Sequence, residues 1–329
     1  MKKPLKQPKK QNKGGKKKKY KVRNWKEYNQ ALVDRGKIFF WITEEAIRNW
    51  EEQQKTGKRG KPRTFSNIAI ETALTLQQVF HMPLRTGEGF LASILAHTAP
   101  CLKAPDHSTL SIRAKTLLIS IRVRSLRAEP LHIVTDSTGV KIYGEGEWKV
   151  RMHGWSKHRT WRKLHIGVDE KTGEILLGEV TGNDAADSEV FGSLLNQLPL
   201  QHPIDQVSAD GAYDRRACYK ALKERGVSRV AIPPQHNAKI WQHGNTRAER
   251  LARDENLRRI RKIGRTRWKI EQNYHRRSLA ETGMFRLKTI FGDRVSARTF
   301  DNQRTQLLIR CRALNWMTTL GMPDSYVVA

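Results

Sequence analysis

The pattern of apolar residues changes at Pro130, and this change constrains the fold more than any other feature of the sequence. Upstream of it, apolar residues recur with helical spacing, as in the run from Asn67 to Val79. Downstream, short β-rich runs are interspersed with helical segments, which is typical of a mixed sheet with helices on its faces. We therefore predict an all-α domain at residues 22–128 and an α/β domain at residues 129–329.

The α/β region contains five runs that we expect to form strands and two that we expect to form helices. Two of the strands flank the turn Glu170–Gly173 and predict a hairpin. The expected strands are Leu131–Thr135, Leu164–Asp169, Glu174–Val180, Gln206–Ala209 and Val227–Ile232, and the expected helices are Asp187–Leu198 and Asp214–Glu224.

The chain is strongly basic throughout. It carries 62 Lys and Arg against 32 Asp and Glu, a formal net charge of +30. Residues 1–23 hold twelve basic residues and no acid, so 30 − 12 = +18 remains on the rest. This balance predicts polyanionic partners for the folded part as well as for the leader. Residues 1–21 have almost no apolar side chains, and we expect them to form a disordered basic arm.

Two classes of protein are disfavoured by the remaining composition. No apolar run approaches the ~18 residues that a membrane span needs. The three cysteines, Cys101, Cys218 and Cys311, lie about a hundred residues apart, so no pair has metal-ligand spacing. An odd, scattered set of cysteines indicates a reducing compartment.

Two helices around a loop with two prolines suggest a DNA-reading unit in the first domain. The first helix is expected from Pro83 through Leu95, and the second begins at Asp106 and opens with small polar residues. This arrangement resembles a helix-turn-helix, although an ordinary αα-hairpin has the same pattern. We expect residues 106–118 to contact base edges. The candidate side chains are Ser108, Thr109, Ser111 and Arg113.

Two aspartates share one context in the second domain. Asp136 and Asp210 each follow a short apolar strand and precede small turn residues. Groups at the ends of strands in an open α/β sheet project into a common crevice. Two converging carboxylates in a basic protein are candidates for binding a hard divalent cation, whereas a single such aspartate is more often a turn or capping residue.

A third candidate group lies on one predicted helix near the C-terminus. At about 100° per residue, its four members fall on a stripe roughly 60° wide. The stripe would place a carboxylate beside cations, although an exposed i,i+4 pair between Arg277 and Glu281 explains part of it equally well. The four residues are Tyr274, Arg277, Glu281 and Lys288.

Other polar residues have simpler interpretations. Asp187 and Asp214 stand where helix N-caps are expected, and Glu271 points about 80° away from the stripe. Three histidines, at 153, 158 and 165, lack a cysteine or close carboxylate to complete a zinc site. They lie in a basic strip that we interpret as a nucleic-acid surface. Its candidate contacts are Arg159, Trp161 and Lys163.

The stripe and the two aspartate contexts together resemble a known family. The spacing of Tyr274, Arg277, Glu281 and Lys288 is similar to the Y-R-E-K signature of DDE-type transposases of bacterial insertion sequences. Residues 105–110, 158–165, 313–316 and 320–323 resemble the IS-five-like branch of that family. The likeness covers roughly residues 22–323.

The resemblance implies a ribonuclease-H-like core behind an N-terminal helix-turn-helix domain. It implies that Asp136, Asp210 and Glu281 hold two Mg²⁺ ions, which Mn²⁺ could replace, and that Tyr274, Arg277 and Lys288 contact phosphates of the transposon ends. It further implies double-stranded DNA as partner, a homodimer on paired ends, and a bacterial, cytoplasmic, nucleoid-associated protein.

Two alternatives remain open at the level of the sequence. One is a non-catalytic, sequence-specific DNA-binding protein, for which the three acidic residues are dispensable. The other is a nuclease or resolvase that uses the metals but does not join DNA strands.

Overall fold

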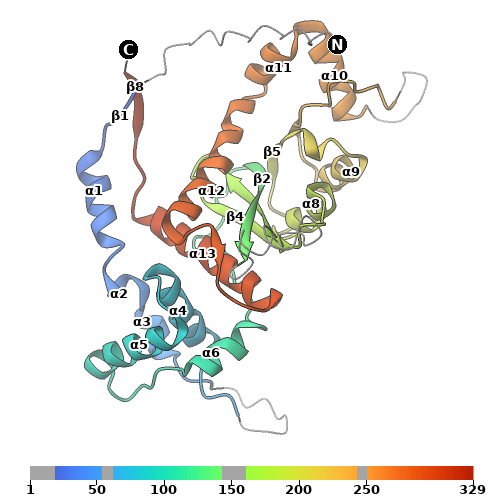
Figure 1. Cartoon of the computed structure of the whole chain (residues 1–329). Helices are drawn as coiled ribbons and strands as arrows, with labels where there is room; N and C mark the ends of the chain where they lie inside the picture. The colour runs from blue at the N-terminus through green and yellow to red at the C-terminus, as the bar shows by residue number, and fades with distance from the viewer. Residues whose placement is uncertain (1–18, 54–61, 143–160, 243–249, 329) are drawn as a thin grey trace, which may run out of the picture.

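The computed structural model describes residues 19–53, 62–142, 161–242 and 250–328. Figure 1 shows most helices of the first third of the chain at one end of the molecule, a twisted sheet in the middle, and the last two long helices of the chain across one face of that sheet. The mixed α/β character predicted from the sequence is confirmed.

Among the described residues, the N-terminal part contains six helices, and several begin at side-chain caps. Thr43, Ser66 and Asp106 each accept a hydrogen bond from a backbone N–H in the first turn of the following helix. The helix predicted at Asn67–Val79 has those bounds in the structure. The helices are α1 (Trp25–Asp34), α2 (Ile38–Trp41), α3 (Glu44–Arg48), α4 (Asn67–Val79), α5 (Leu84–Thr98) and α6 (His107–Ala114).

Six strands form the central sheet, in the order β4-β3-β2-β5-β6, with β7 pairing with β2. Strand β3 pairs antiparallel with both β4 and β2. Strands β5 and β7 are parallel to β2, and β6 is parallel to β5. The strands are β2 (Leu131–Ile142), β3 (Trp161–Asp169), β4 (Ile175–Thr181), β5 (Ile204–Ser208), β6 (Arg229–Ala231) and β7 (Arg294–Val295).

Strand β2 is longer than the sequence predicted. The run was expected to end before Asp136, because Ser137-Thr138-Gly139 has the composition of a turn. Instead β2 continues to Ile142, since β3 pairs with it without interruption from Ile133 to Lys141. Pairing with a long neighbour therefore outweighs local turn propensity here.

The two faces of the sheet pack against different helices. Leu131 and Ile133 of β2 belong to the cluster under α8 (Asp187–Leu195) and α9 (Arg216–Glu224). Val134 and Val140 belong to the larger cluster on the opposite face. That larger cluster extends into the N-terminal helices, so no solvent layer separates the two predicted domains.

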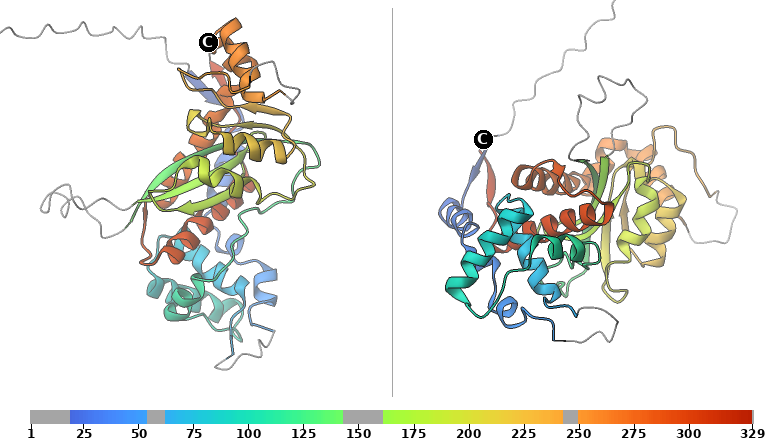
Figure 2. Two further views of the ribbon diagram at one scale, coloured as in Figure 1. Left: turned by 90° about the vertical axis from the view of Figure 1, so that its right-hand side faces the viewer. Right: turned by 60° about the horizontal axis from the view of Figure 1, so that its bottom comes forward.

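Helix α13 (Phe300–Leu320) joins the N-terminal helices to the sheet, and Figure 2 shows it between them. The buried side chain of Asn315 accepts from Ile175 N (2.8 Å) and donates to Ile175 O (2.8 Å) at the start of β4. Thr305 donates to Ala114 O at the end of α6 (2.7 Å). None of the described helices combines the length and apolarity needed to cross a bilayer.

The C-terminal basic segment is helical with two interruptions. Gly264 (φ +84°) separates α10 (Ala252–Ile263) from α11 (Arg265–Glu271), and Asn273 (φ +50°) lies between α11 and the next turn. That turn is the 3₁₀ helix η2 (Tyr274–Arg277), which runs directly into α12 (Ser278–Phe291).

The basic arm and two helix caps differ from the predictions. Most of the predicted disordered arm lies outside the described residues, but its last part belongs to a strand, β1 (Lys19–Val22), which pairs antiparallel with β8 (Ser325–Val328). Asp187 is the first residue of α8 and pairs with Lys163 instead of capping. Asp214 lies before α9 in a buried ion pair with Arg253 (2.7 Å).

The described cysteines form no disulfide. Cys101 is exposed, whereas Cys218 and Cys311 are buried. Burial raises the pKa of the Cys218 thiol to about 11, so this group is a packing residue at neutral pH.

Candidate active site

Asp136 stands where one edge of β2 loses its neighbour. On one side β2 is paired with β3 from Ile133 to Lys141, but on the other side it pairs with β5 only from Leu131 to Val134. Asp136 comes two residues later, on the same face as Val134, which is the face that α12 covers. Its side chain is 17% exposed and accepts a hydrogen bond from Ser137 N (2.9 Å).

Asp210 lies at the matching position on the neighbouring strand. Ser208 pairs with Val134 in the parallel β2–β5 register, so Asp136 and Asp210 each follow that pair by two residues. Adjacent strands are about 4.8 Å apart, which brings the two aspartates to one edge of the sheet. Asp210 also caps the 3₁₀ helix η1 (Gly211–Tyr213), because its Oδ1 accepts from Ala212 N (2.8 Å). Asp210 therefore caps η1, and its position in the register also agrees with the expected convergence of the two carboxylates.

The stripe predicted on the C-terminal helix meets these aspartates. The guanidinium of Arg277 donates from Nη1 to Asp136 Oδ2 (2.8 Å) and from Nη2 to Glu281 Oε1. The Tyr274 ring lies 6.0 Å from the same guanidinium. Because η2 continues into α12, the four residues remain close to one helical face despite the change of helix type. Lys288, seven residues after Glu281, is about 10 Å further along α12.

The three carboxylates influence the pKa values of the groups beside them. Burial raises the pKa of Asp136, the Ser137 amide and Arg277 oppose that rise, and Asp210 and Glu281 add to it. The pKa of Tyr274 is raised chiefly by burial and also by all three carboxylates, with Arg277 again opposing. The result is an acidic centre, defined by Asp136, Asp210 and Glu281, in a chain of net charge +30.

The donor set of the acidic centre suits a hard divalent cation, because all three side chains offer carboxylate oxygens. Two of them already share one cation, the Arg277 guanidinium. Across the described ranges, no three ligating side chains surround one point closely enough to hold a metal ion. Binding a metal between Asp136 and Glu281 therefore requires Arg277 to give up those contacts.

Comparison with known proteins places the chain in a family. Residues 33–145 match one family model described as a transposase DDE domain, and residues 127–316 match a second model with the same description. The second match alone covers more than half of the chain. The chain belongs to the DDE transposase family.

Similarity to a solved structure is weaker. A cryo-EM structure of the piggyBac transposase synaptic complex with hairpin DNA matches at 12% identity and a TM-score of 0.39, over 88% of this chain and 74% of that one. At that TM-score the likeness carries no mechanistic argument.

The predicted base-contacting residues of this DDE transposase are only partly available to DNA. Arg113 is buried, and its guanidinium donates to Phe65 O (2.7 Å) and Asn67 Oδ1 (2.7 Å). The Thr109 hydroxyl donates to Asp106 Oδ2 (2.6 Å) within the helix cap. Ser108 is exposed. The burial of Arg113 argues against a base contact, because the charged group ties α6 to the start of α4.

The predicted basic strip is also modified by the structure. Arg159 lies outside the described residues. Lys163 donates to Ala185 O (3.0 Å) and pairs with Asp187 (2.9 Å), so its charge is used within the fold. Trp161 is half-buried, with its ring 3.5 Å from where a Cβ on Gly139 would stand. This packing within the sheet argues against Trp161 as a contact for DNA.

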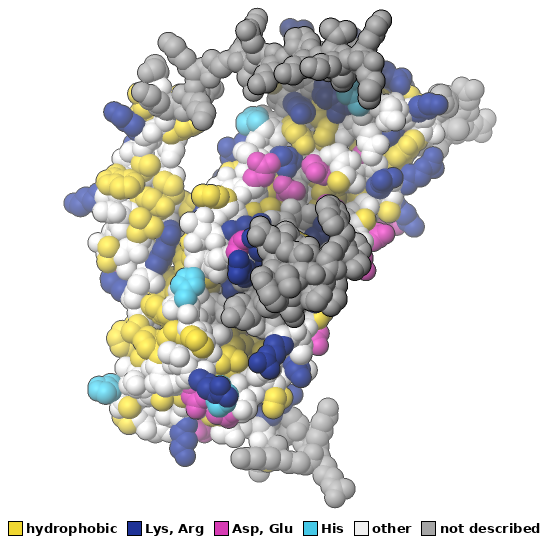
Figure 3. Space-filling model, in the orientation of Figure 1, with side chains coloured by type: hydrophobic (Ala, Val, Ile, Leu, Met, Phe, Trp, Pro, Cys, Tyr) yellow, Lys and Arg dark blue, Asp and Glu magenta, His cyan; other side chains and the backbone are white. Residues whose placement is uncertain are grey.

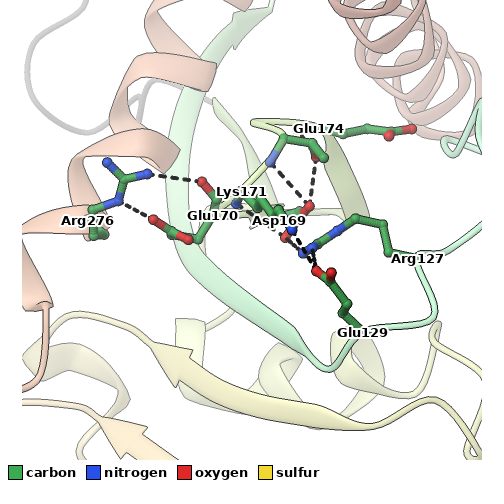
Figure 4. A network of polar contacts seen from close by, with 8 residues as sticks. Arg127, Glu129, Asp169, Glu170, Lys171, Glu174 and Arg276 are labelled. Carbon is green, nitrogen blue, oxygen red and sulfur yellow. Dashed lines mark hydrogen bonds and ion pairs between the residues drawn. The ribbon is translucent and has the colours of Figure 1, made fainter. Parts of the chain in front are cut away.

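An ion pair that the sequence did not indicate supports η2. Arg276 pairs with Glu170 in the β3–β4 hairpin turn, and its Nη2 donates to Glu170 O (3.3 Å). Figure 4 shows Arg276 reaching this turn from one side, while Arg127, Glu129 and Lys171 form a network on the other. Such a contact joins residues 106 positions apart, and no local pattern could have revealed it.

Proposed function

We propose that this protein is the transposase of an IS-five-like bacterial insertion sequence. It binds the terminal inverted repeats, cleaves the DNA at the ends, and joins the freed 3′-hydroxyls to target DNA. The observation that carries the proposal is the meeting of Asp136, Glu281 and Arg277 at the sheet edge where Asp210 follows the adjacent strand. The strand order, with three antiparallel strands followed by parallel β5 and β6, supports a ribonuclease-H-like core.

Asp136, Asp210 and Glu281 would hold two Mg²⁺ ions, with Mn²⁺ as a substitute. When bound, the metals supply charge neutralisation at the phosphate and activation of water, which phosphoryl transfer requires. Arg277 of η2 and Lys288 of α12, eleven residues or about 16 Å apart along the helical axis, would then bind two phosphates and fix the scissile bond. Tyr274, whose ring lies 6.0 Å from the Arg277 guanidinium, would contact a phosphate of the same transposon end.

Two displacement reactions follow from this arrangement. In the first, a water oxygen bonds to phosphorus, the P–O3′ bond breaks, and the departing 3′ oxygen takes up a proton to become the free 3′-hydroxyl. In the second, the freed 3′-hydroxyl attacks a target phosphodiester and releases a target 3′-hydroxyl. Neither reaction needs a covalent intermediate with the protein.

DNA binding by residues 22–128 remains part of the proposal, with α5 and α6 as the reading unit. Ser108 keeps a free approach to a groove, whereas Arg113 does not. The net charge of +30 supports phosphate contacts along several elements. Assembly as a homodimer on two paired ends, in the bacterial cytoplasm and nucleoid, completes the proposed function.

A cleavage assay distinguishes this function from non-catalytic DNA binding. Asp136→Asn should abolish Mg²⁺- or Mn²⁺-dependent nicking of DNA that carries the element's ends, while DNA binding is retained. Glu271→Gln is the matched control, since Glu271 is an exposed carboxylate ten residues before Glu281 and pairs with Arg259. Equal cleavage by wild type and Asp136→Asn would contradict the proposal, and nicking without joined products would indicate a nuclease.

A further inference from the structure

A cavity of about 580 Å³ lies between the N-terminal helices and α13, built from residues outside the acidic centre. Its volume is within the ~300–1,000 Å³ range of small-molecule sites. The walls come from α4, α5, α6, α13 and the segment after β7, and they are mainly apolar. Leu74, Met82, Leu110 and Ile309 are among the apolar lining residues.

Arg310 brings a buried positive charge to this cavity. The residue is 5% exposed, and its guanidinium donates to Gln78 Oε1 (2.7 Å) and Arg294 O (2.8 Å). Within residues 19–53, 62–142, 161–242 and 250–328, it contacts no Asp or Glu side chain. Burial lowers the pKa of Arg310 to about 10, so it stays charged at neutral pH. A buried cation that has only neutral acceptors is stabilised by an anion placed beside it.

Two amide side chains of the lining each have one polar atom without a hydrogen-bond partner among the described residues. Asn302 Oδ1 is buried and accepts no hydrogen bond in the described part of the chain, although Asn302 Nδ2 donates to Ser111 O (3.1 Å). Gln77 Oε1 accepts from Gln78 (3.2 Å), whereas Gln77 Nε2 donates to none of the described residues. One free acceptor and one free donor in an apolar cavity match the polar edge of a heterocyclic base.

A second cation lies at the cavity and is open to solvent. Arg85 of α5 lines the cavity, is exposed, and forms no ion pair with any described residue. His107 also lines the cavity, but its Nδ1 lies 2.9 Å from Glu88 Oε2, so the imidazole is less available to a ligand. Arg85 can therefore reach a phosphate without breaking an existing contact.

We propose that this cavity binds a nucleotide. The apolar walls receive the sugar and base, Gln77 and Asn302 hydrogen-bond the base edge, and Arg310 and Arg85 supply charge for the phosphate. A free mononucleotide and the terminal nucleotide of a DNA strand share this chemistry. The site is separate from the acidic centre, so its failure and the failure of the proposed transposase function are distinguishable.

Titration calorimetry on the full chain tests the proposal with dAMP, deoxyadenosine and inorganic phosphate. Because base and phosphate both contribute, dAMP should bind at least ten-fold more tightly than either half, a difference of about 1.4 kcal/mol. Arg85→Ala should weaken dAMP binding roughly ten-fold. Arg267→Ala, which removes an exposed arginine from α11, should leave it unchanged.

A second variant tests the case in which another side chain compensates for the loss of Arg85. Gln77→Leu should also weaken dAMP binding, and circular dichroism should show that it folds. Absence of binding by dAMP, dGMP, dCMP and dTMP overturns the proposal. Unchanged dAMP affinity in both Arg85→Ala and Gln77→Leu overturns it equally.

Competition identifies the source of the nucleotide. A saturating DNA duplex with a single-stranded end displaces dAMP if a strand terminus occupies the cavity. Retention of dAMP on the DNA-bound protein assigns the site to a free mononucleotide. Both outcomes require the dAMP binding that the first experiment measures.

Discussion

At the scale of single residues, the acidic centre depends on the placement of η2. Glu170, in the turn between β3 and β4, contacts η2 through its ion pair with Arg276. Glu170 N donates to His132 O (2.9 Å), which fixes the hairpin turn against β2. The side chain then pairs with Arg276, next to Arg277 in η2. Glu170 is therefore a positioning residue, since it touches none of the three acidic residues.

We expect Glu170→Gln to lower the rate of DNA cleavage roughly ten-fold, since small displacements of a positioning group cost that much or more. DNA affinity should change far less, so the loss appears in kcat and not in KM. Glu129→Gln is the control, because Glu129 pairs with Lys171 and Arg127 on the other side of the same hairpin (Figure 4).

Exchanging the charges of Glu170 and Arg276 tests whether their ion pair, and not the fold in general, accounts for the lost cleavage rate. The double variant Glu170→Arg, Arg276→Glu should recover part of the lost cleavage rate. A cleavage rate as low in the double variant as in Glu170→Gln would argue against the ion pair.

Arg113 shows how a residue's chemistry can mislead when its burial is unknown. Its charge and its place after small polar residues suggested base contacts, but two hydrogen bonds tie it to the segment before and at the start of α4. We expect Arg113→Ala to lower the free energy of unfolding by about 1–3 kcal/mol, because Phe65 O loses its donor. Urea denaturation measures this. Unchanged stability together with lost end-specific DNA binding would restore the original interpretation.

At the scale of elements, strands and helices with strong local patterns were predicted and those fixed by neighbours were not. Helix α4 has its predicted bounds because Ser66 caps it and its apolar spacing is regular. Strand β2 extends past Asp136 only because β3 pairs with it, which the sequence around Asp136 does not encode. The candidate acidic residues were found because short motifs mark them, whereas Glu170 and Asn315 act through partners more than 100 positions away.

His165 of β3 makes the stability of the sheet dependent on pH. It is 1% exposed, its Nε2 lies 2.9 Å from Thr181 Oγ1 of β4, and burial lowers its pKa below the ordinary 6.5. The unfolded chain therefore binds this proton at higher pH than the folded chain does. The stabilising contribution is complete above about pH 6.5 and is lost as the pH falls toward the lowered value.

The measurement is the free energy of unfolding at pH 7.5, 6.5 and 5.5 for wild type and His165→Gln. The variant should lose less stability than wild type over this interval. His97→Gln is the control, since His97 is exposed on α5. Identical pH profiles for wild type and His165→Gln would refute the assignment.

At the scale of the whole molecule, the positive charge is distributed over the fold. Figure 3 shows Lys and Arg side chains spread over the visible face, not gathered at one end. Residues 1–18 hold nine lysines and no acid, so a chain without them keeps 30 − 9 = +21. The amino-acid composition alone predicted this excess of positive charge outside the leader, because a net charge requires only residue counts.

Deletion of residues 1–18 should therefore weaken DNA binding without abolishing it. The remaining +21 still releases counterions on binding, so the logarithm of the affinity should fall with the logarithm of salt at a slope of about −0.9 per phosphate contacted. Fluorescence anisotropy with labelled duplex at several KCl concentrations gives both slopes. A shortened protein that has lost its salt-dependent affinity would place DNA binding in the leader, whereas a reduced but steep slope places most phosphate contacts on the folded surface that surrounds the acidic centre.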